Sequence, residues 1–287
     1  MPPTLLPIIG HPLTDSPLEG ALRRALAGIG SPVEIERWER RPHLLADALA
    51  EIRGGEQFAG ALIAPPHKEK APPLSDWLSD DARLSGAVSL FVRTDKRLRG
   101  HNTDADGVRA GLAAILPRVK GKWPRNAVVL GAGGAARAVV AVLIGSGFQH
   151  VAVLNRHLHR AEALVTHFNR TSRHMELRAR PWHDAIIEAE LTRAELLVNA
   201  SGPGVDGEGT PIPTGLIPPD RYFLDLALGS GPNPLLDAVA ASGGTTANGE
   251  TALAAAISSI IELLTGVTPA AEVVRAAVAD EIGVEAR

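Results

Sequence analysis

The sequence of 287 residues contains no cysteine, which excludes disulfide bonds, cysteine-based zinc sites and thiol nucleophiles. Aromatic residues are also scarce, with five Phe, four Trp and one Tyr, so base-stacking platforms and aromatic-lined sugar clefts are not expected. The net charge of −3 provides no basic field for nucleic acid or an anionic membrane. Together these absences favour a protein that acts on small molecules.

Long hydrophobic segments are missing as well. The most apolar stretch, residues 252–264, contains Glu262 and is too short to span a bilayer, and the N-terminus does not have the pattern of a signal peptide. We therefore expect a soluble, cytoplasmic protein without a nucleic-acid or membrane partner, present as a monomer or homodimer. With no H-E-x-x-H spacing among the histidines, we also expect no metal site.

What is present is a succession of short apolar runs separated by helical patterns. A first series predicts strands at residues 5–10, 34–38, 59–64 and 88–93, with helices at 17–29 and 43–52. A second series predicts strands at 126–130, 151–154, 195–198 and 223–226, with helices at 135–146 and 158–168. Alternating strands and helices predict mainly parallel sheets, hence two α/β domains with a cleft between them, the C-terminal one a Rossmann-type doubly wound parallel sheet.

The domain edge is expected near the polar, proline-flanked segment 116–124, and two more helices are expected at 250–264 and 269–282. Periodicity alone does not decide which domain these last helices join.

The strongest chemical signal is a glycine-rich turn between an apolar strand and a helix. Residues 131–136 fit G-x-G-x-x-A, in which Gly131 allows the tight turn and Gly133 lets a pyrophosphate approach the backbone. Gly134 and Ala135 open the helix, whose free N–H groups attract phosphate. The alternative is a glycine-rich connection that binds nothing.

The end of the next predicted strand indicates which dinucleotide binds. An NAD site usually carries Asp or Glu there, whereas this chain has Asn155 and Arg156, with Arg160 one helical turn further on. The guanidinium fork suits a 2′-phosphate, so we expect NADP as the cofactor. The alternative is a pair of solvated surface arginines.

Several segments together resemble the shikimate dehydrogenase family, over nearly the whole chain. The glycine-rich turn looks like the family's GAGGAARA loop, and Asn155-Arg156 looks like the start of its Asn-Arg-Thr motif. The family's Asn-Thr-Asp-x-x-Gly, Pro-x-Lys and Asn-Ala-Thr-x-x-Gly-Met segments have counterparts at residues 102–107, 66–68 and 199–205.

The resemblance implies a catalytic pair formed by Lys68 and Asp104, and a nicotinamide site beside Asn199, Ala200 and Ser201. It also implies a discontinuous substrate-binding domain, residues 1–106 plus 250–287, around an NADP-binding domain, residues 107–249, and a place in aromatic amino acid biosynthesis. Taken alone, Lys68 could be a loop lysine. Asp104 could cap a helix starting near Val108, for which Asp106 is the better-placed cap.

The substrate-side positions depart from the family. Ser16, Ser89, Asn102 and Ala256 stand where the resemblance puts substrate-binding groups. Other positions that are polar in the family have become apolar here, namely Leu62, Ala64, Leu90 and Leu228. These would leave the hydroxyls and carboxylate of shikimate largely unpaired. His67 and His101 lie next to proposed site positions and are candidate auxiliaries that could donate to a substrate carbonyl.

We therefore predict an NADP-dependent oxidoreductase that transfers hydride reversibly between NADPH and a cyclic ketone or alcohol. The substrate would be of the 3-dehydroshikimate/shikimate type or a less polar relative. The alternative is a catalytically weak dinucleotide-binding regulatory or sensor protein on the same fold. A third possibility is a true shikimate or quinate dehydrogenase with a repacked site.

Overall fold

The computed structural model describes residues 4–116, 124–171, 174–201, 210–228 and 233–283. The chain divides into two compact units, residues 1–106 with 253–287 and residues 107–252. The first division falls inside helix α4 (Asp104–Ile115) and not in the segment 116–124 that the sequence suggested, of which residues 117–123 lie outside the described residues. Helix α9 (Gly249–Thr265) contains the second division. None of the helices in the described ranges has the length and hydropathy of a membrane-spanning segment.

The first unit is built on a six-stranded mixed sheet with the order β2-β1-β3-β5-β6-β4. Its strands are β1 (Thr4–Gly10), β2 (Val33–Glu39), β3 (Gly60–Ile63), β4 (Trp77–Leu78), β5 (Leu90–Thr94) and β6 (Arg97–His101). Strand β5 runs antiparallel to both of its neighbours, so this sheet is less parallel than the alternation of elements predicts. The cause is the short turn at Asp95, whose positive φ lets β5 return directly as β6.

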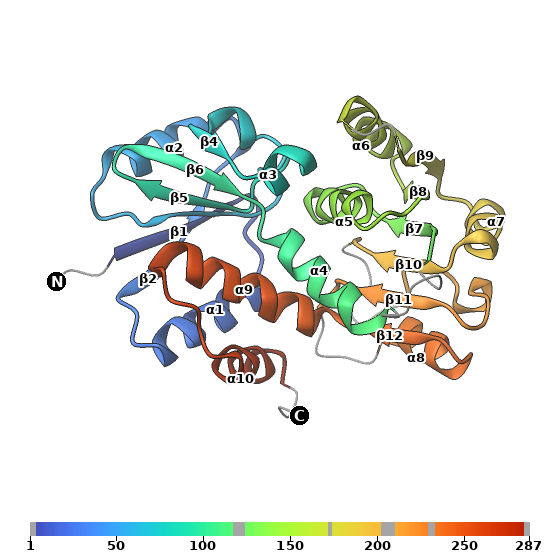
Figure 1. Cartoon of the computed structure of the whole chain (residues 1–287). Coiled ribbons are helices and arrows are strands. Elements are labelled where there is room, and N and C mark those ends of the chain that lie inside the picture. The colour runs from blue at the N-terminus through green and yellow to red at the C-terminus, as the bar shows by residue number, and fades with distance from the viewer. Residues whose placement is uncertain (1–3, 117–123, 172–173, 202–209, 229–232, 284–287) are drawn as a thin grey trace. The chain divides into compact units, whose positions relative to one another are not determined.

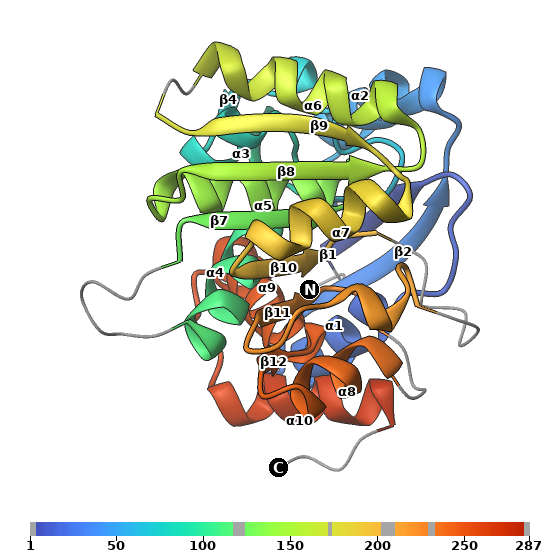
Figure 2. The same ribbon diagram turned by 90° about the vertical axis from the view of Figure 1, so that its right-hand side faces the viewer.

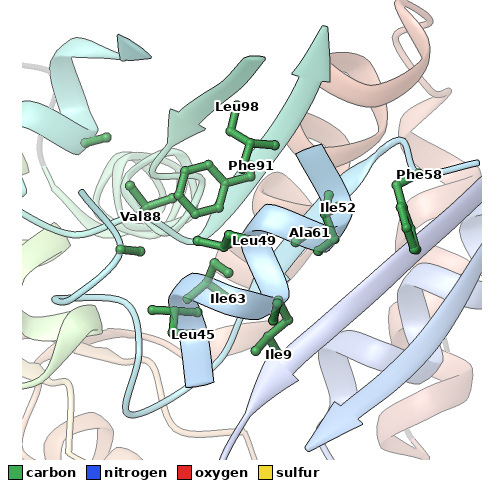
Figure 3. Packing of buried hydrophobic residues seen from close by; sticks show 13 residues of the cluster. Ile9, Leu45, Leu49, Ile52, Phe58, Ala61, Ile63, Val88, Phe91 and Leu98 are labelled. Carbon is green, nitrogen blue, oxygen red and sulfur yellow. The ribbon is translucent and has the colours of Figure 1, made fainter. Parts of the chain in front are cut away.

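Helices cover both faces of this sheet. Helices α2 (Leu45–Gly54) and α3 (Asp80–Ser85) lie on one face, and α1 (Pro17–Gly28) and α10 (Ala271–Ile282) lie on the other (Figure 1). Short 3-10 turns occur at Pro42–Leu44 and Pro72–Leu74. Leu45, Leu49 and Ile52 of α2 pack on the sheet beside Phe91 and Leu98 (Figure 3). The i, i+4 and i+7 spacing of these three residues places them on one helical face.

The second unit contains a fully parallel six-stranded sheet with the order β12-β11-β10-β7-β8-β9. Its strands are β7 (Asn126–Leu130), β8 (His150–Asn155), β9 (Glu176–Pro181), β10 (Leu196–Asn199), β11 (Tyr222–Asp225) and β12 (Thr245–Ala247). Helices α5 (Gly134–Gly145) and α6 (Leu158–Thr171) lie on one face, and α7 (Asp184–Arg193) and α8 (Pro234–Ala241) lie on the other (Figure 2). A 3-10 turn spans Thr214–Leu216. This is the Rossmann-type doubly wound order that the sequence predicts, and its strand order reverses between β7 and β10.

Candidate functional site

In the first unit, the candidate residues gather at one edge of the sheet. Strands β1, β3 and β6 all end there and β5 begins there, because β5 is antiparallel to its neighbours. Lys68 follows β3, Ser89 precedes β5, and Asp104 follows β6. Residues that are distant in sequence are therefore brought to one place by strand polarity.

The central feature of this edge is an ion pair. Lys68 Nζ donates to Asp104 Oδ2 at 2.6 Å, and the two side chains are 18% and 22% exposed. Partial exposure leaves both groups accessible to a ligand while limiting the water around them. A paired ammonium and carboxylate in this setting can donate a proton to one oxygen and accept a hydrogen bond from another.

Local backbone bonds hold each member of the pair. The Lys68 carbonyl accepts from Val88 N at 2.9 Å, which ties the turn to the segment before β5. Asp104 is the first residue of α4, so Asp106 lies within the first turn and is not the cap that the sequence indicates. Thr103 N, directly before the helix, donates to Ser89 Oγ at 2.8 Å.

The neighbouring polar residues are bonded mainly to one another. The hydroxyls of Ser89 and Thr103 lie 2.9 Å apart, and both residues are buried. Asn102 is also buried and donates to Ser85 Oγ at 2.8 Å. The hydroxyl of Ser89 and the amide N–H groups of Asn102 are therefore bonded within the protein, whereas Asn102 Oδ1 has no partner among the described residues.

The apolar positions on this side are largely enclosed. Leu62 and Leu90 face each other across β3 and β5 and are 2% and 0% exposed. Ala64 is half-buried, and a side chain built on Gly10 would lie 3.0 Å from its Cβ. Ser16 is exposed at the N-cap of α1, where its hydroxyl makes no capping bond. Ala256 is half-buried on α9.

The two candidate histidines differ in environment. His67 is fully buried, so the expectation that it donates to a substrate carbonyl is wrong. Its Nε2–H instead donates to the Arg40 carbonyl at 2.8 Å. His101 packs against Trp77 with 5.5 Å between ring centroids, and burial, followed by repulsion from Arg99, holds its pKa below the usual value.

A cavity of about 240 Å³ opens beside His101 and Asn102. It contains neither Lys68 nor Asp104, and we do not assign the chemistry to it. Its walls come from α3, β6, α4 and α9 and comprise Ser79, Asp81, His101, Asn102, Thr103, Asp106, Ser259, Glu262 and Leu263.

In the second unit, the glycine-rich turn follows β7, at the reversal of strand order. Gly131 has φ of 106°, and a Cβ there would lie 2.6 Å from the Ala200 carbonyl oxygen. Gly133 is the N-cap of α5, which continues through Gly134 and Ala135. Among the described residues, a Cβ on Gly133 would meet only Arg160 Nη2, at 3.8 Å, so this described stretch of backbone leaves room for a ligand. The turn thus leaves the N–H groups at the start of α5 available for an anion.

The end of β8 supplies two cations to the same edge of the sheet. Arg156 and Arg160 are exposed, and Arg160 reaches toward Gly133. Asn155 turns its amide back to donate to the His157 carbonyl at 2.9 Å, which shapes the loop that carries Arg156. The arrangement places positive charge near the glycine-rich turn, as a phosphorylated ligand requires.

Strands β10 and β11 end in a buried polar network that the sequence did not reveal. Asn199 is fully buried, donates to Asp225 Oδ1 at 2.9 Å, and accepts from Ser201 N and Oγ at 3.1 and 2.7 Å. Asp225 also accepts from Ala227 N and from Asn233 Nδ2, both at 2.8 Å. Asn199 therefore shapes the loop after β10 through its side chain. The remainder of that motif, residues 202–205, lies outside the described residues.

Burial raises the pKa of Asp225, although its three donors oppose the shift. Replacing Asp225 by Ala would leave the amides of Asn199 and Asn233 and one backbone N–H without their acceptor. We expect the free energy of unfolding to fall by about 2–4 kcal/mol, measured by urea denaturation. The matched control is Asp237→Ala, which removes a carboxylate from α8 instead. Equal stability of the two variants would contradict the role of this network.

Comparison with known proteins finds a family model that matches part of each unit. Residues 8–90 match the model of the shikimate dehydrogenase substrate binding domain, and residues 116–200 match that of shikimate / quinate 5-dehydrogenase. A shikimate dehydrogenase (NADP(+)) of Geobacter metallireducens is 33% identical over 274 residues, which cover 94% of each chain. The chain belongs to the shikimate dehydrogenase family.

Two further members of the shikimate dehydrogenase family show the extent of the similarity. A shikimate dehydrogenase (NADP(+)) of Brucella abortus (strain S19) is 38% identical over 186 residues, covering 64% of this chain but only 60% of the relative. The crystal structure of a Thermus thermophilus shikimate 5-dehydrogenase in complex with NADP(H) and shikimate is 31% identical. It has a TM-score of 0.77 and covers 96% of this chain and 99% of that one.

Proposed function

We propose that this member of the shikimate dehydrogenase family is an NADP-dependent oxidoreductase. It would transfer hydride reversibly between NADPH and a cyclic ketone or alcohol of the 3-dehydroshikimate/shikimate type or a less polar relative. The observation that carries the proposal is the 2.6 Å Lys68–Asp104 pair at the edge of the first unit. We assign catalysis to these two residues and NADP binding to residues 107–252.

The residues of the second unit fit a phosphorylated dinucleotide. The open backbone at Gly133 and the start of α5 would hold the pyrophosphate, and Arg156 with Arg160 would pair with the 2′-phosphate. Asn155 would shape the loop that presents Arg156, and Asn199, Ala200 and Ser201 would line the nicotinamide side. NADPH, when bound, supplies the hydride that reduces the carbonyl carbon.

Lys68 and Asp104 provide the proton chemistry. In the reductive direction, Lys68 Nζ donates a proton to the carbonyl oxygen as negative charge develops on it. Asp104 holds the ammonium in position and accepts a hydrogen bond from a substrate hydroxyl. In the oxidative direction, the neutral amine takes the proton back from the alcohol.

The residues around the pair favour a substrate with few hydroxyls. Ser89 bonds to Thr103, Asn102 bonds to Ser85, and Leu62 and Leu90 are enclosed. A polyhydroxylated acid would lose water at this edge and recover few hydrogen bonds, which costs binding energy. Of the candidate substrate-binding residues, Ser16 has an exposed hydroxyl that could bind a substrate. Ala64 and Ala256 are half-buried and would offer an apolar surface.

The test follows NADPH absorbance while shikimate, quinate, 3-dehydroshikimate and simple cyclic ketones are offered. We expect turnover of a less polar cyclic ketone to exceed turnover of 3-dehydroshikimate. Oxidation of shikimate at a rate typical of dehydrogenases would contradict the less polar substrate and favour a repacked shikimate or quinate dehydrogenase. Tight NADPH binding without turnover on the whole panel would favour the regulatory or sensor function, which the enclosed apolar positions also suit.

The cofactor assignment yields a separate binding prediction. Arg156→Ala removes one charged partner of the 2′-phosphate, so the Kd for NADPH should rise by about 10–100-fold while the Kd for NADH changes little. Fluorescence titration of both dinucleotides measures this without turnover. Arg170→Ala is the matched control, because Arg170 is an exposed arginine in the last turn of α6, the helix that follows Arg156. A parallel loss of NADH affinity would argue against a 2′-phosphate contact.

A further inference from the structure

His67 connects the turn that carries Lys68 to a different part of the first unit. Its imidazole is fully buried, and its Nε2–H donates to the carbonyl of Arg40, the residue after β2. Arg40 N in turn donates to the Gly10 carbonyl at 2.9 Å, at the end of β1. The side chain of His67 thus links the turn that carries Lys68 to Arg40 after β2 and, through Arg40, to the end of β1.

The backbone of His67 also organises the turn itself. His67 N donates to the Ala64 carbonyl at 3.1 Å, and the His67 carbonyl accepts from Lys70 N and Ala71 N at 2.9 and 3.0 Å. These bonds close the turn on both sides of Lys68. Once His67 is held at Arg40, the Cα of Lys68 has little freedom to move.

We propose that His67 is a positioning residue that holds Lys68 against Asp104 through its hydrogen bond to the Arg40 carbonyl. The inference rests on the proposed function, because it gives Lys68 the role of proton donor. Displacing a catalytic group by about 1 Å can cost two orders of magnitude in rate, so a distant hydrogen bond of this kind has a measurable effect.

The partners of His67 indicate its protonation state. A carbonyl only accepts, so Nε2 must carry a proton, and Nδ1 has no partner within the described part of the chain. Burial holds the pKa of His67 below its usual value, although the hydrogen bond to the Arg40 carbonyl opposes the shift, and Lys70 and His11 lower the pKa further. The neutral Nε2–H tautomer is therefore the favoured state.

Three substitutions separate the hydrogen bond from the bulk of the side chain. In His67→Gln, the amide nitrogen reaches as far as Nε2 and can donate to Arg40. In His67→Leu the donor is lost, and in His67→Asn a donor remains but is too short to reach. His43→Leu is the matched control, since His43 is an exposed histidine on the Pro42–Leu44 turn.

The first readout is kinetic. We expect kcat to fall roughly tenfold in His67→Leu and His67→Asn and to stay within about threefold in His67→Gln, with the KM for NADPH unchanged. The primary isotope effect on kcat with 4-deuterated NADPH should rise in the two impaired variants, because the chemical step becomes slower. A simple loss of folded enzyme would lower the apparent kcat without changing the isotope effect, and that result would overturn the proposal.

The second readout does not require turnover. Trace acetylation followed by mass spectrometry reports how strongly each lysine is held, with Lys70 and Lys96 as internal references. We expect labelling of Lys68 to rise about threefold or more in His67→Leu and His67→Asn and to stay at the wild-type level in His67→Gln and His43→Leu. Unchanged labelling in a folded His67→Asn protein would overturn the positioning role. Increased labelling without any kinetic change would support positioning and contradict the catalytic role of Lys68.

Discussion

Lys68→Met should lower kcat by about 10³-fold while the Kd for NADPH stays within twofold of wild type. Methionine matches the length and volume of the lysine stem but carries no proton, so the variant removes acid–base catalysis and leaves the fold intact. Stopped-flow or steady-state NADPH oxidation gives the rate, and fluorescence titration gives the affinity.

Lys70→Met provides the matched control for Lys68→Met. Lys70 lies two residues away and is exposed, so we expect its replacement to change kcat by less than about twofold. Asp104→Asn should lower kcat by less than Lys68→Met does, because the amide can still orient the ammonium of Lys68 although it no longer carries the charge that attracts it. If Lys68→Met retained most of its activity, the assignment of the proton donor would have to move elsewhere.

The second large effect is expected at Gly131. Alanine there would have to adopt φ near 106° with its Cβ 2.6 Å from the Ala200 carbonyl oxygen. Backbone strain of this kind costs about 1–3 kcal/mol, and the clash pushes the loop after β10 away from β7. We expect Gly131→Ala to lower the free energy of unfolding by about that amount and to weaken NADPH binding at least tenfold.

Gly145→Ala is the control for Gly131→Ala. Gly145 ends α5, and a Cβ there meets no atom of the described part of the chain within 4 Å. This substitution should leave NADPH binding unchanged and raise the stability by about 0.4–1 kcal/mol, because it restricts only the unfolded chain. Equal losses in the two variants would show that the backbone at Gly131 is not special.

Local signals explain which parts of the fold the sequence could predict. The apolar strands β1, β3, β7 and β10 and the glycine-rich turn were recognisable because the information lies in a few adjacent residues. Strand β6, by contrast, contains Arg97 and Arg99, and β9 contains Arg178 and Arg180. Charged residues on exposed faces interrupt the apolar pattern, so periodicity did not indicate these strands.

The candidate site likewise contains residues that the sequence indicated and residues that it did not. Lys68 and Asp104 lie 36 positions apart in the sequence. From the sequence, only the resemblance to a known family paired them, and the structure shows that the direction of the strands brings them together. The buried partners of Asn199 and His67 were not accessible to sequence reasoning. Asp225 bonds to Asn199 and Arg40 bonds to His67 as long-range contacts near the ends of different strands, which no local motif encodes. The enclosure of Leu62 and Leu90 likewise depends on their cross-strand register.

The path of the chain through the first unit has a consequence for biosynthesis. Helix α10 packs on α1, where a Cβ on Gly28 would lie 2.9 Å from Val273, and Arg24 pairs with Glu281. Roughly 240 residues separate the end of α1 from the start of α10. At about 5–20 residues per second, the ribosome needs on the order of 10–50 s to deliver the second helix. During that time α1 lacks its partner while the second unit is synthesised. Residues 17–28 of the nascent chain therefore remain without the α10 contact until residues 271–282 have been synthesised.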